Sequence, residues 1–188
     1  MRIVSVGLFA ALLLGGPAIA AEVEGVKLAD KVQVGDAELA LNGAGVRTRF
    51  FVRVYVGALY LQKKAGRADA VLGDGGAKRI AMHMLREVSA ARLYAGLDEG
   101  IRDNHPAEQV AQFGPQMKQF QAIFDAVKAA RAGDTFFLDY TPGNGTRVIV
   151  NGETKGTVAG DEFNRALLRI WLGEQPVDSS LKKAMLGG

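Results

Sequence analysis

The chain has 188 residues, with 23 lysines and arginines against 20 aspartates and glutamates and a formal net charge of +3. This near balance, without a basic tract interleaved with aromatic residues, argues against a nucleic-acid-binding protein. The chain contains no cysteine, which excludes disulfide bonds, thiol catalysis and cysteine-ligated metal sites.

The N-terminus has the pattern of a secretory signal peptide. Arg2 supplies a positive charge, a short apolar run follows, and a Gly-Gly-Pro break precedes a small-residue site that fits cleavage before Ala21. The apolar run is too short for a membrane span of about 20 residues. We therefore expect a signal peptide at residues 1–20. The mature chain, residues 21–188, would be one periplasmic domain without a transmembrane span.

The most β-prone run of the chain is Leu41–Leu61, which is rich in valine, phenylalanine and tyrosine and has no proline. Residues 23–34 and 37–42 predict a hairpin ahead of it, and the glycine-rich residues 42–45 predict a turn or bulge. We expect one long strand to follow this turn.

The two faces of this predicted strand differ, because successive side chains point to opposite sides. The even positions are almost uniformly apolar and are expected in the core. The odd positions begin cationic and end apolar; they are Arg47, Arg49, Phe51, Arg53, Tyr55, Gly57, Leu59 and Leu61.

Arg47 and Tyr55 are the candidate polar residues of this odd face. An arginine binds a carboxylate or a polarised carbonyl through its fork of donors, and an apolar wall beside it would suit a fatty acid or a phenolic ketone. The alternative is a half-solvated strand whose arginines face water.

The remainder of the chain predicts an α+β domain with helices between strands. The expected elements are a helical turn at 68–72, a strand at 78–88, helices from Ser89 to 103 and from 110 to 127 with a break at Gly114-Pro115, strands at 135–140, 147–150 and 153–158, and helices starting at Asp161 and near Asp178.

Motifs for catalysis or metal binding are lacking in the sequence. His83 and His105 have no partner at metal-ligand spacing, and no Gly-x-Ser-x-Gly elbow occurs. The glycines of residues 142–145 join two strands and do not open a helix, unlike a phosphate-binding loop. No cofactor and no metal are therefore predicted.

Several local motifs resemble those of the chalcone isomerase family, most of all the exported chalcone-isomerase-like proteins of bacteria. They are Gly43-Ala-Gly-Val-Arg47, Val54-Tyr-Val-Gly-Ala-Leu-Tyr-Leu61, Met82-His-Met-Leu-Arg86, Ile170-Trp-Leu-Gly173 and Pro176-x-Asp178-x-x-Leu181-Lys182. The resemblance implies an open-faced β-sandwich, in which an antiparallel sheet carries a layer of helices on one face and a ligand cleft lies between them.

The resemblance also implies site residues. In the plant enzymes an arginine after Gly-x-Gly-x orients the phenolate nucleophile, supported by a threonine, a tyrosine and an asparagine. Non-enzymatic relatives use the corresponding arginine and a tyrosine to hold a fatty-acid carboxylate. Here Arg47 matches the arginine and Tyr55 falls near the threonine position, whereas Leu93 stands at the tyrosine position with Tyr94 next to it.

The enzyme's set of residues is incomplete, because Gly100 or Ile101 stands where the enzymes have asparagine and Asn104 comes too late. The leading hypothesis is therefore a non-catalytic periplasmic binding protein for a fatty acid or similar amphipathic carboxylate. Its predicted ligand-binding residues are Arg47, Tyr55 and Tyr94.

Two alternatives stay open. One is an intramolecular lyase or isomerase of the chalcone isomerase type, acting on a phenolic or enone substrate. The other is an interaction module of the cell envelope with no small ligand, which a cleft packed shut by Phe113, Phe120 and Phe124 would favour.

Overall fold

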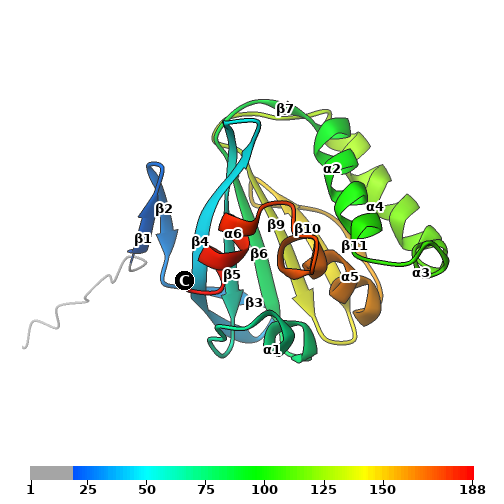
Figure 1. Ribbon diagram of the computed structural model, residues 1–188, viewed down its shortest axis with the longest axis horizontal. Coiled ribbons are helices and arrows are strands. Elements are labelled where there is room, and N and C mark those ends of the chain that lie inside the picture. Colours follow the sequence, from blue (N-terminus) through cyan, green and yellow to red (C-terminus); the bar gives the residue numbers. More distant parts are fainter. Residues whose placement is uncertain (1–18) are drawn as a thin grey trace, which may run out of the picture.

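A curved antiparallel sheet forms the centre of the protein (Figure 1). The computed structural model describes residues 19–188, so the predicted signal peptide lies outside the described residues except for its last two. Within the described chain, seven strands form the sheet, and every neighbouring pair is antiparallel. In spatial order they are β11 (Glu153–Val158), β10 (Gly145–Val150), β9 (Thr135–Thr141), β6 (Lys78–Met84), β5 (Val52–Leu61), β4 (Ala37–Arg49) and β3 (Lys31–Val34).

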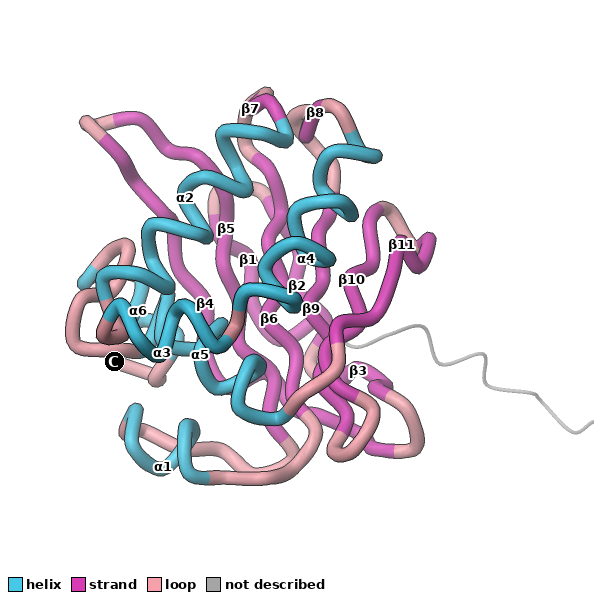
Figure 2. The backbone as a smooth tube through the Cα atoms, turned by 90° about the vertical axis from the view of Figure 1, so that its right-hand side faces the viewer, coloured by secondary structure: helices cyan, strands magenta, loops and turns pink. Residues whose placement is uncertain are grey.

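Helices cover one face of this sheet (Figures 1 and 2). The predicted break at Gly114-Pro115 is confirmed, since one helix ends at Gln112 and the next begins at Gly114. The predicted α+β class, an antiparallel sheet with helices on one face, is confirmed. The helices are α1 (Ala68–Gly73), α2 (Ala90–Asp103), α3 (Ala107–Gln112), α4 (Gly114–Val127), α5 (Asp161–Leu172) and α6 (Ser179–Met185). The short strands β7 (Val88–Ser89) and β8 (Ala129–Ala130) pair ahead of α2 and after α4.

The alternation of side chains separates two hydrophobic clusters. Ile80, Met82 and Met84 of β6 face the helices and join the larger cluster. Val56 and Ala58 of β5 face the other side. There they pack in a smaller cluster that includes Leu28 of the hairpin formed by β1 (Ile19–Val23) and β2 (Val26–Ala29). The helices therefore cover the face that carries Tyr55.

The prediction of one long strand within Leu41–Leu61 is wrong. The chain reverses at Phe50 and Phe51, whose φ angles are 48° and 64°, and β4 pairs with β5 as a hairpin. Two-residue turns with positive φ usually contain Asn-Gly or Asp-Gly, so two phenylalanines give no sequence signal for one. Of the turn or bulge predicted at residues 42–45, the structure has the bulge, a register shift between Leu41 and Gly43 inside β4, and no turn.

The C-terminal helix α6 packs directly on β4 and β5. A Cβ atom at Gly43 would lie 2.1 Å from the carbonyl oxygen of Ala184, and one at Gly45 would lie 2.7 Å from the Cβ of Ala184. Gly57 of β5 faces Leu181 in the same way, at 3.2 Å. These glycines therefore allow a helix to approach closer than any side chain would permit.

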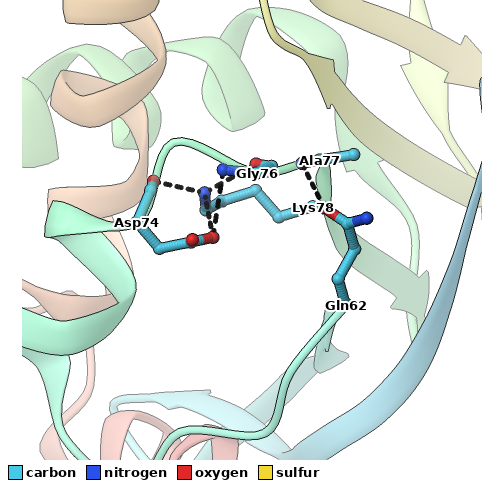
Figure 3. A network of polar contacts seen from close by, with 5 residues as sticks. All are labelled: Gln62, Asp74, Gly76, Ala77 and Lys78. Carbon is cyan, nitrogen blue, oxygen red and sulfur yellow. Dashed lines mark hydrogen bonds and ion pairs between the residues drawn. The ribbon is translucent and has the colours of Figure 1, made fainter.

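The buried Lys78 of β6 binds the loop that follows α1 through hydrogen bonds (Figure 3). The Nζ of Lys78 donates to the carbonyl oxygens of Asp74 at 2.7 Å and Gly76 at 2.8 Å, and to the Asp74 carboxylate at 3.2 Å. Burial lowers the pKa of Lys78, and the Asp74 carboxylate opposes that shift. Gln62 accepts from the backbone N–H of Ala77 beside it. The lysine thus acts as a structural cation.

Replacement of Gly43 by alanine tests the contact with α6. The new methyl group would meet backbone atoms of Ala184 and Met185, which cannot rotate away, so we expect a loss of about 1–3 kcal/mol in the free energy of unfolding. The control is Gly96→Ala in α2, where a Cβ has nothing within 4 Å and helix propensity favours alanine. Urea denaturation of both variants measures the difference; equal stability of the two would contradict the close-packing role of Gly43.

Candidate functional site

A pocket of about 940 Å³ lies between the outer half of the β4–β5 hairpin and helix α2. Its walls combine apolar side chains with arginines and two glutamates. The residues that line it include Arg47, Arg49, Phe50, Val52, Val54, Tyr55, Arg86, Glu87, Val88, Ser89, Arg92, Leu93, Leu97, Glu99 and Val177. A concave site of this size, mostly apolar with a few converging polar groups, is typical of small-molecule binding.

Arg47 and Tyr55 lie opposite each other on β4 and β5. On one continuous strand, eight residues would separate them by roughly 26 Å; the hairpin instead makes them cross-strand neighbours. Their pairing sits directly beside a register shift between Arg47 and Thr48. The structure therefore brings these two predicted site residues together.

Tyr55 is buried, with 5% of its surface exposed. Its hydroxyl oxygen accepts a hydrogen bond of 2.9 Å from the indole Nε1 of Trp171. Burial raises the pKa of Tyr55 to about 12, while the Trp171 donor and the Arg47 charge act in the opposite direction. Tyr55 is therefore a neutral phenol at physiological pH. Within the described chain its proton has no acceptor at hydrogen-bond distance, so it can donate to a ligand.

Arg47 is half-buried and carries its charge toward the same pocket. Its Nη1 donates to the Thr48 carbonyl oxygen at 2.6 Å, and no carboxylate of the described residues lies within ion-pair distance of it. The carboxylate of Asp178 is engaged elsewhere, accepting from the backbone N–H groups of Thr48, Ser180 and Leu181. Arg47 thus retains donors for an anionic ligand.

One wall of the pocket is apolar, and the first turn of α2 lies beside it. Leu93 and Leu97 of α2, Val54 of β5 and Val177 give it an apolar wall. Helix α2 begins here, with the Ser89 hydroxyl accepting from the Arg92 N–H at 3.3 Å, as a helix cap does.

Tyr94 is not part of this pocket. A step of one residue turns a helix by about 100°, so Tyr94 points toward α4 while its neighbour Leu93 faces the pocket. The Tyr94 hydroxyl donates to the Met117 carbonyl oxygen at 3.3 Å, and its ring lies 6.2 Å from those of Phe120 and Phe124. It lines a separate depression between α2, α3 and α4. The structure does not bring it together with Arg47 and Tyr55.

Other members of the site had no recognisable signal in the sequence. Trp171 belongs to the apolar stripe of α5, and nothing in that spacing shows that its N–H reaches Tyr55 on a distant strand. Arg86 and Arg92 enter the pocket only through the arrangement of β6 and α2 around the hairpin. Residues 21–188 contain no cluster of three or more histidine or acidic side chains suited to a metal ion. No helix of the described chain is long and apolar enough to cross a bilayer.

The curved sheet, the helical layer on one face and the pocket at one end define a protein with a chalcone-isomerase-like architecture. The model of the chalcone isomerase-like family matches residues 20–187; the chain belongs to this family. Among solved structures, it is similar to a fatty-acid-binding protein of Arabidopsis thaliana, with a TM-score of 0.65 and 18% identity over 86% of this chain and 92% of the plant protein. No curated protein matches it by sequence.

Tyr55→Phe tests the buried phenol through the pH dependence of stability. At pH 8 the variant should be about 1–3 kcal/mol less stable, because the Trp171 N–H loses its acceptor. Since the folded state favours the neutral phenol, the contribution of Tyr55 is complete below its ordinary pKa of 10.0 and is lost as the pH rises through about 12.

The difference between wild type and Tyr55→Phe should therefore narrow by roughly 2 kcal/mol between pH 9 and pH 12. Urea denaturation at each pH gives this difference, and the other tyrosines cancel because both proteins contain them. A gap that stays constant across this range would contradict the raised pKa of Tyr55.

Proposed function

We propose that this protein is a non-catalytic binding protein that holds a fatty acid or a similar amphipathic carboxylate in the pocket between the β4–β5 hairpin and α2. The observation that carries the proposal is the pair formed by Arg47 and Tyr55. Within residues 19–188, a half-buried arginine without a carboxylate partner faces a neutral phenol whose proton has no acceptor, in a pocket that also has an apolar wall.

The chemistry of this pair suits a carboxylate better than a neutral polar group. The guanidinium of Arg47 supplies charge-assisted hydrogen bonds, each contributing about 1.5–3 kcal/mol. Tyr55 remains protonated and can donate to the second carboxylate oxygen. The acyl chain would lie along Leu93, Leu97 and Val177, where each buried methylene contributes about 0.8 kcal/mol. The similar plant structure, a fatty-acid-binding protein, supports the same ligand class.

The enzymatic alternative has less support than a binding protein. In a lyase of the chalcone isomerase type, a tyrosine and an asparagine would assist Arg47. The pocket has Leu93 where the tyrosine is expected, and Asn104 binds Gly100 and Gln175 instead. Turnover of a chalcone above background, lost in an Arg47 variant, would restore the enzymatic reading.

The condition that favoured an interaction module is not met. Phe113, Phe120 and Phe124 are buried in the core that α4 shares with the sheet, and none of them lines the pocket beside Arg47. They therefore leave this cleft open.

The first test compares two ligands on two proteins. Arg47→Gln should weaken the binding of palmitate by about 10- to 100-fold, while the corresponding fatty alcohol, which has no charge, should lose little. Titration calorimetry of the mature protein measures both. The thermal midpoint should stay within about 2 °C of wild type, because Arg47 makes no ion pair in the described chain.

The matched control is Arg165→Gln, which removes a half-buried arginine paired with Glu162 on α5 and should leave both affinities unchanged. If the alcohol and the acid lose affinity equally, the pocket does not recognise a carboxylate. If Arg47→Gln unfolds the protein, the arginine is a structural strut and the proposal fails.

We also propose that the protein works in the periplasm. The charged start, the short apolar run and the small-residue site before Ala21 support export. If cleavage occurs there, Ala21, Glu22 and Val23 of β1 keep their pairing with β2.

Expression of the full chain in a Gram-negative host should yield a periplasmic protein that starts at Ala21, as intact mass spectrometry would show. An Ala20→Arg variant should block this cleavage, because signal peptidase sites need a small residue there. Recovery of the wild-type chain from the cytoplasm with residues 1–20 still attached would contradict export.

A further inference from the structure

The tip of the β4–β5 hairpin exposes two adjacent aromatic side chains. Phe50 is 84% exposed and Phe51 is fully exposed, followed by Val52 at 40%. They are the large hydrophobic residues that the described chain leaves in solvent. In Figure 2 this hairpin projects from the upper part of the molecule, beyond α2. No element of residues 19–188 covers its tip.

The backbone of this turn is unsuited to phenylalanine. Both residues have positive φ angles, 48° and 64°, a conformation that side chains larger than those of glycine, asparagine or aspartate adopt at a cost. The comparable turn between β10 and β11 uses Asn151 and Gly152, with φ angles of 50° and 82°. An Asn-Gly pair would suit the β4–β5 turn equally well, so folding alone does not explain two exposed phenylalanines there.

The same tip forms one end of the proposed binding pocket. Phe50, Arg49 and Val52 all line it. From there β4 and β5 lead inward to Arg47 and Tyr55, which are progressively more buried. A surface that met the two phenylalanines would therefore also meet the mouth of the pocket.

The charge around the tip favours an anionic partner. The pocket is lined by four arginines and two glutamates. Arg49 lies 3.9 Å from Glu99 in an exposed pair, and Glu87 also lies on the rim. Arg86 and Arg92 have no ion-pair partner within the described residues. The guanidinium of Arg49 also lies 5.6 Å from the ring centre of Phe50, so the aromatic and cationic groups present one combined surface.

We propose that Phe50 and Phe51 insert into the surface of an anionic phospholipid bilayer, with Arg49, Arg86 and Arg92 against its headgroups. Exposed aromatic residues partition to the level of the headgroups, and arginines beside them bind anionic lipids. The pocket then opens onto the membrane, from which an amphipathic carboxylate enters carboxylate first toward Arg47. This entry route rests on the proposed function, whereas the membrane contact stands without it.

The experiment is sedimentation of the mature protein with large unilamellar vesicles of phosphatidylcholine, with and without an equal part of phosphatidylglycerol. Wild type should pellet with the anionic vesicles and dissociate as salt is raised. The double variant Phe50→Asn, Phe51→Gly removes both rings but installs the preferred residues of this turn. It should fold with an equal or higher thermal midpoint and bind anionic vesicles at least about tenfold more weakly.

Two double variants test how much the arginines at the tip contribute to vesicle binding. Arg49→Gln with Arg86→Gln should reduce binding to anionic vesicles by roughly tenfold. Arg67→Gln with Arg165→Gln removes the same charge from an exposed arginine before α1 and a half-buried arginine on α5. Both elements lie away from the tip (Figure 1), so this pair should change binding little. An equal loss in both pairs would indicate attraction by net charge alone and would overturn the assignment to this tip.

A fluorescence measurement locates the contact. Phe51→Trp places an indole at the tip, while the native Trp171 is fully buried. Brominated lipids should therefore quench only the introduced indole. Absence of quenching, wild-type protein that stays in the supernatant, or full binding by Phe50→Asn, Phe51→Gly would each overturn the inference. Palmitate binding in a vesicle-free assay tests the proposed function separately, so failure of one does not imply failure of the other.

Discussion

The approach of α6 to the sheet is the constraint on which the site depends. A helix can lie against β4 and β5 at backbone distance only because Gly43, Gly45 and Gly57 carry no side chain. Asn42 fixes the end of this helix by donating to the Met185 carbonyl oxygen at 2.7 Å. Asp178 fixes its beginning, since one carboxylate caps the helix and also accepts from the Thr48 N–H at 2.9 Å. The start of α6 is therefore tied to the strand residue next to Arg47.

This anchoring also decides where the pocket lies. Helix α6 covers the inner part of the hairpin. It begins after its N-cap residue Asp178, which directly follows the pocket residue Val177. Beyond that point the outer part of β4 and β5 faces α2 across an open space. Trp171 of α5 reaches Tyr55 from beneath, so the phenol has a fixed position before any ligand arrives. A preformed donor loses less entropy on binding than a mobile one.

Much of the fold could be predicted because it follows from local patterns. The last three strands were predicted from short-range signals at residues 135–140, 147–150 and 153–158, close to their observed bounds. The break at Gly114-Pro115 was equally clear. The reversal at Phe50 and Phe51 could not be predicted, because the residues that form the turn have strand propensity and its cause lies in long-range pairing.

The candidate site was predictable in part for the same reason. Arg47 and Tyr55 are both odd-numbered, so a single strand would place them on the same face. In the hairpin they also share a face, because they are cross-strand neighbours. The same parity put Arg53 beside them, but the register shift turns it to the opposite face, where it pairs with Glu24. Tyr94 was predicted because it is next to Leu93, the residue at the family's tyrosine position. One residue turns α2 by about 100°, so Tyr94 lines the depression between α2, α3 and α4 instead.

Departures from local folding rules gather at the outer end of the hairpin. The inner end of β4 is closely packed: Gly43 and Gly45 lie beneath α6, and the side chain of Asn42 hydrogen-bonds to backbone groups of Met185 and Ala65. The outer end has a half-buried arginine with no carboxylate of the described residues at ion-pair distance, a bulge, and two phenylalanines in a strained turn exposed to water. The exposed phenylalanines bury little apolar surface, and their positive φ angles cost free energy at residues other than glycine. Sequences that break such rules within an otherwise consistent fold do so most often where they bind something. The proposed ligand site and the proposed membrane contact would account for all three features with one surface: the arginine would bind the carboxylate, the bulge places it opposite Tyr55, and the phenylalanines would contact lipid.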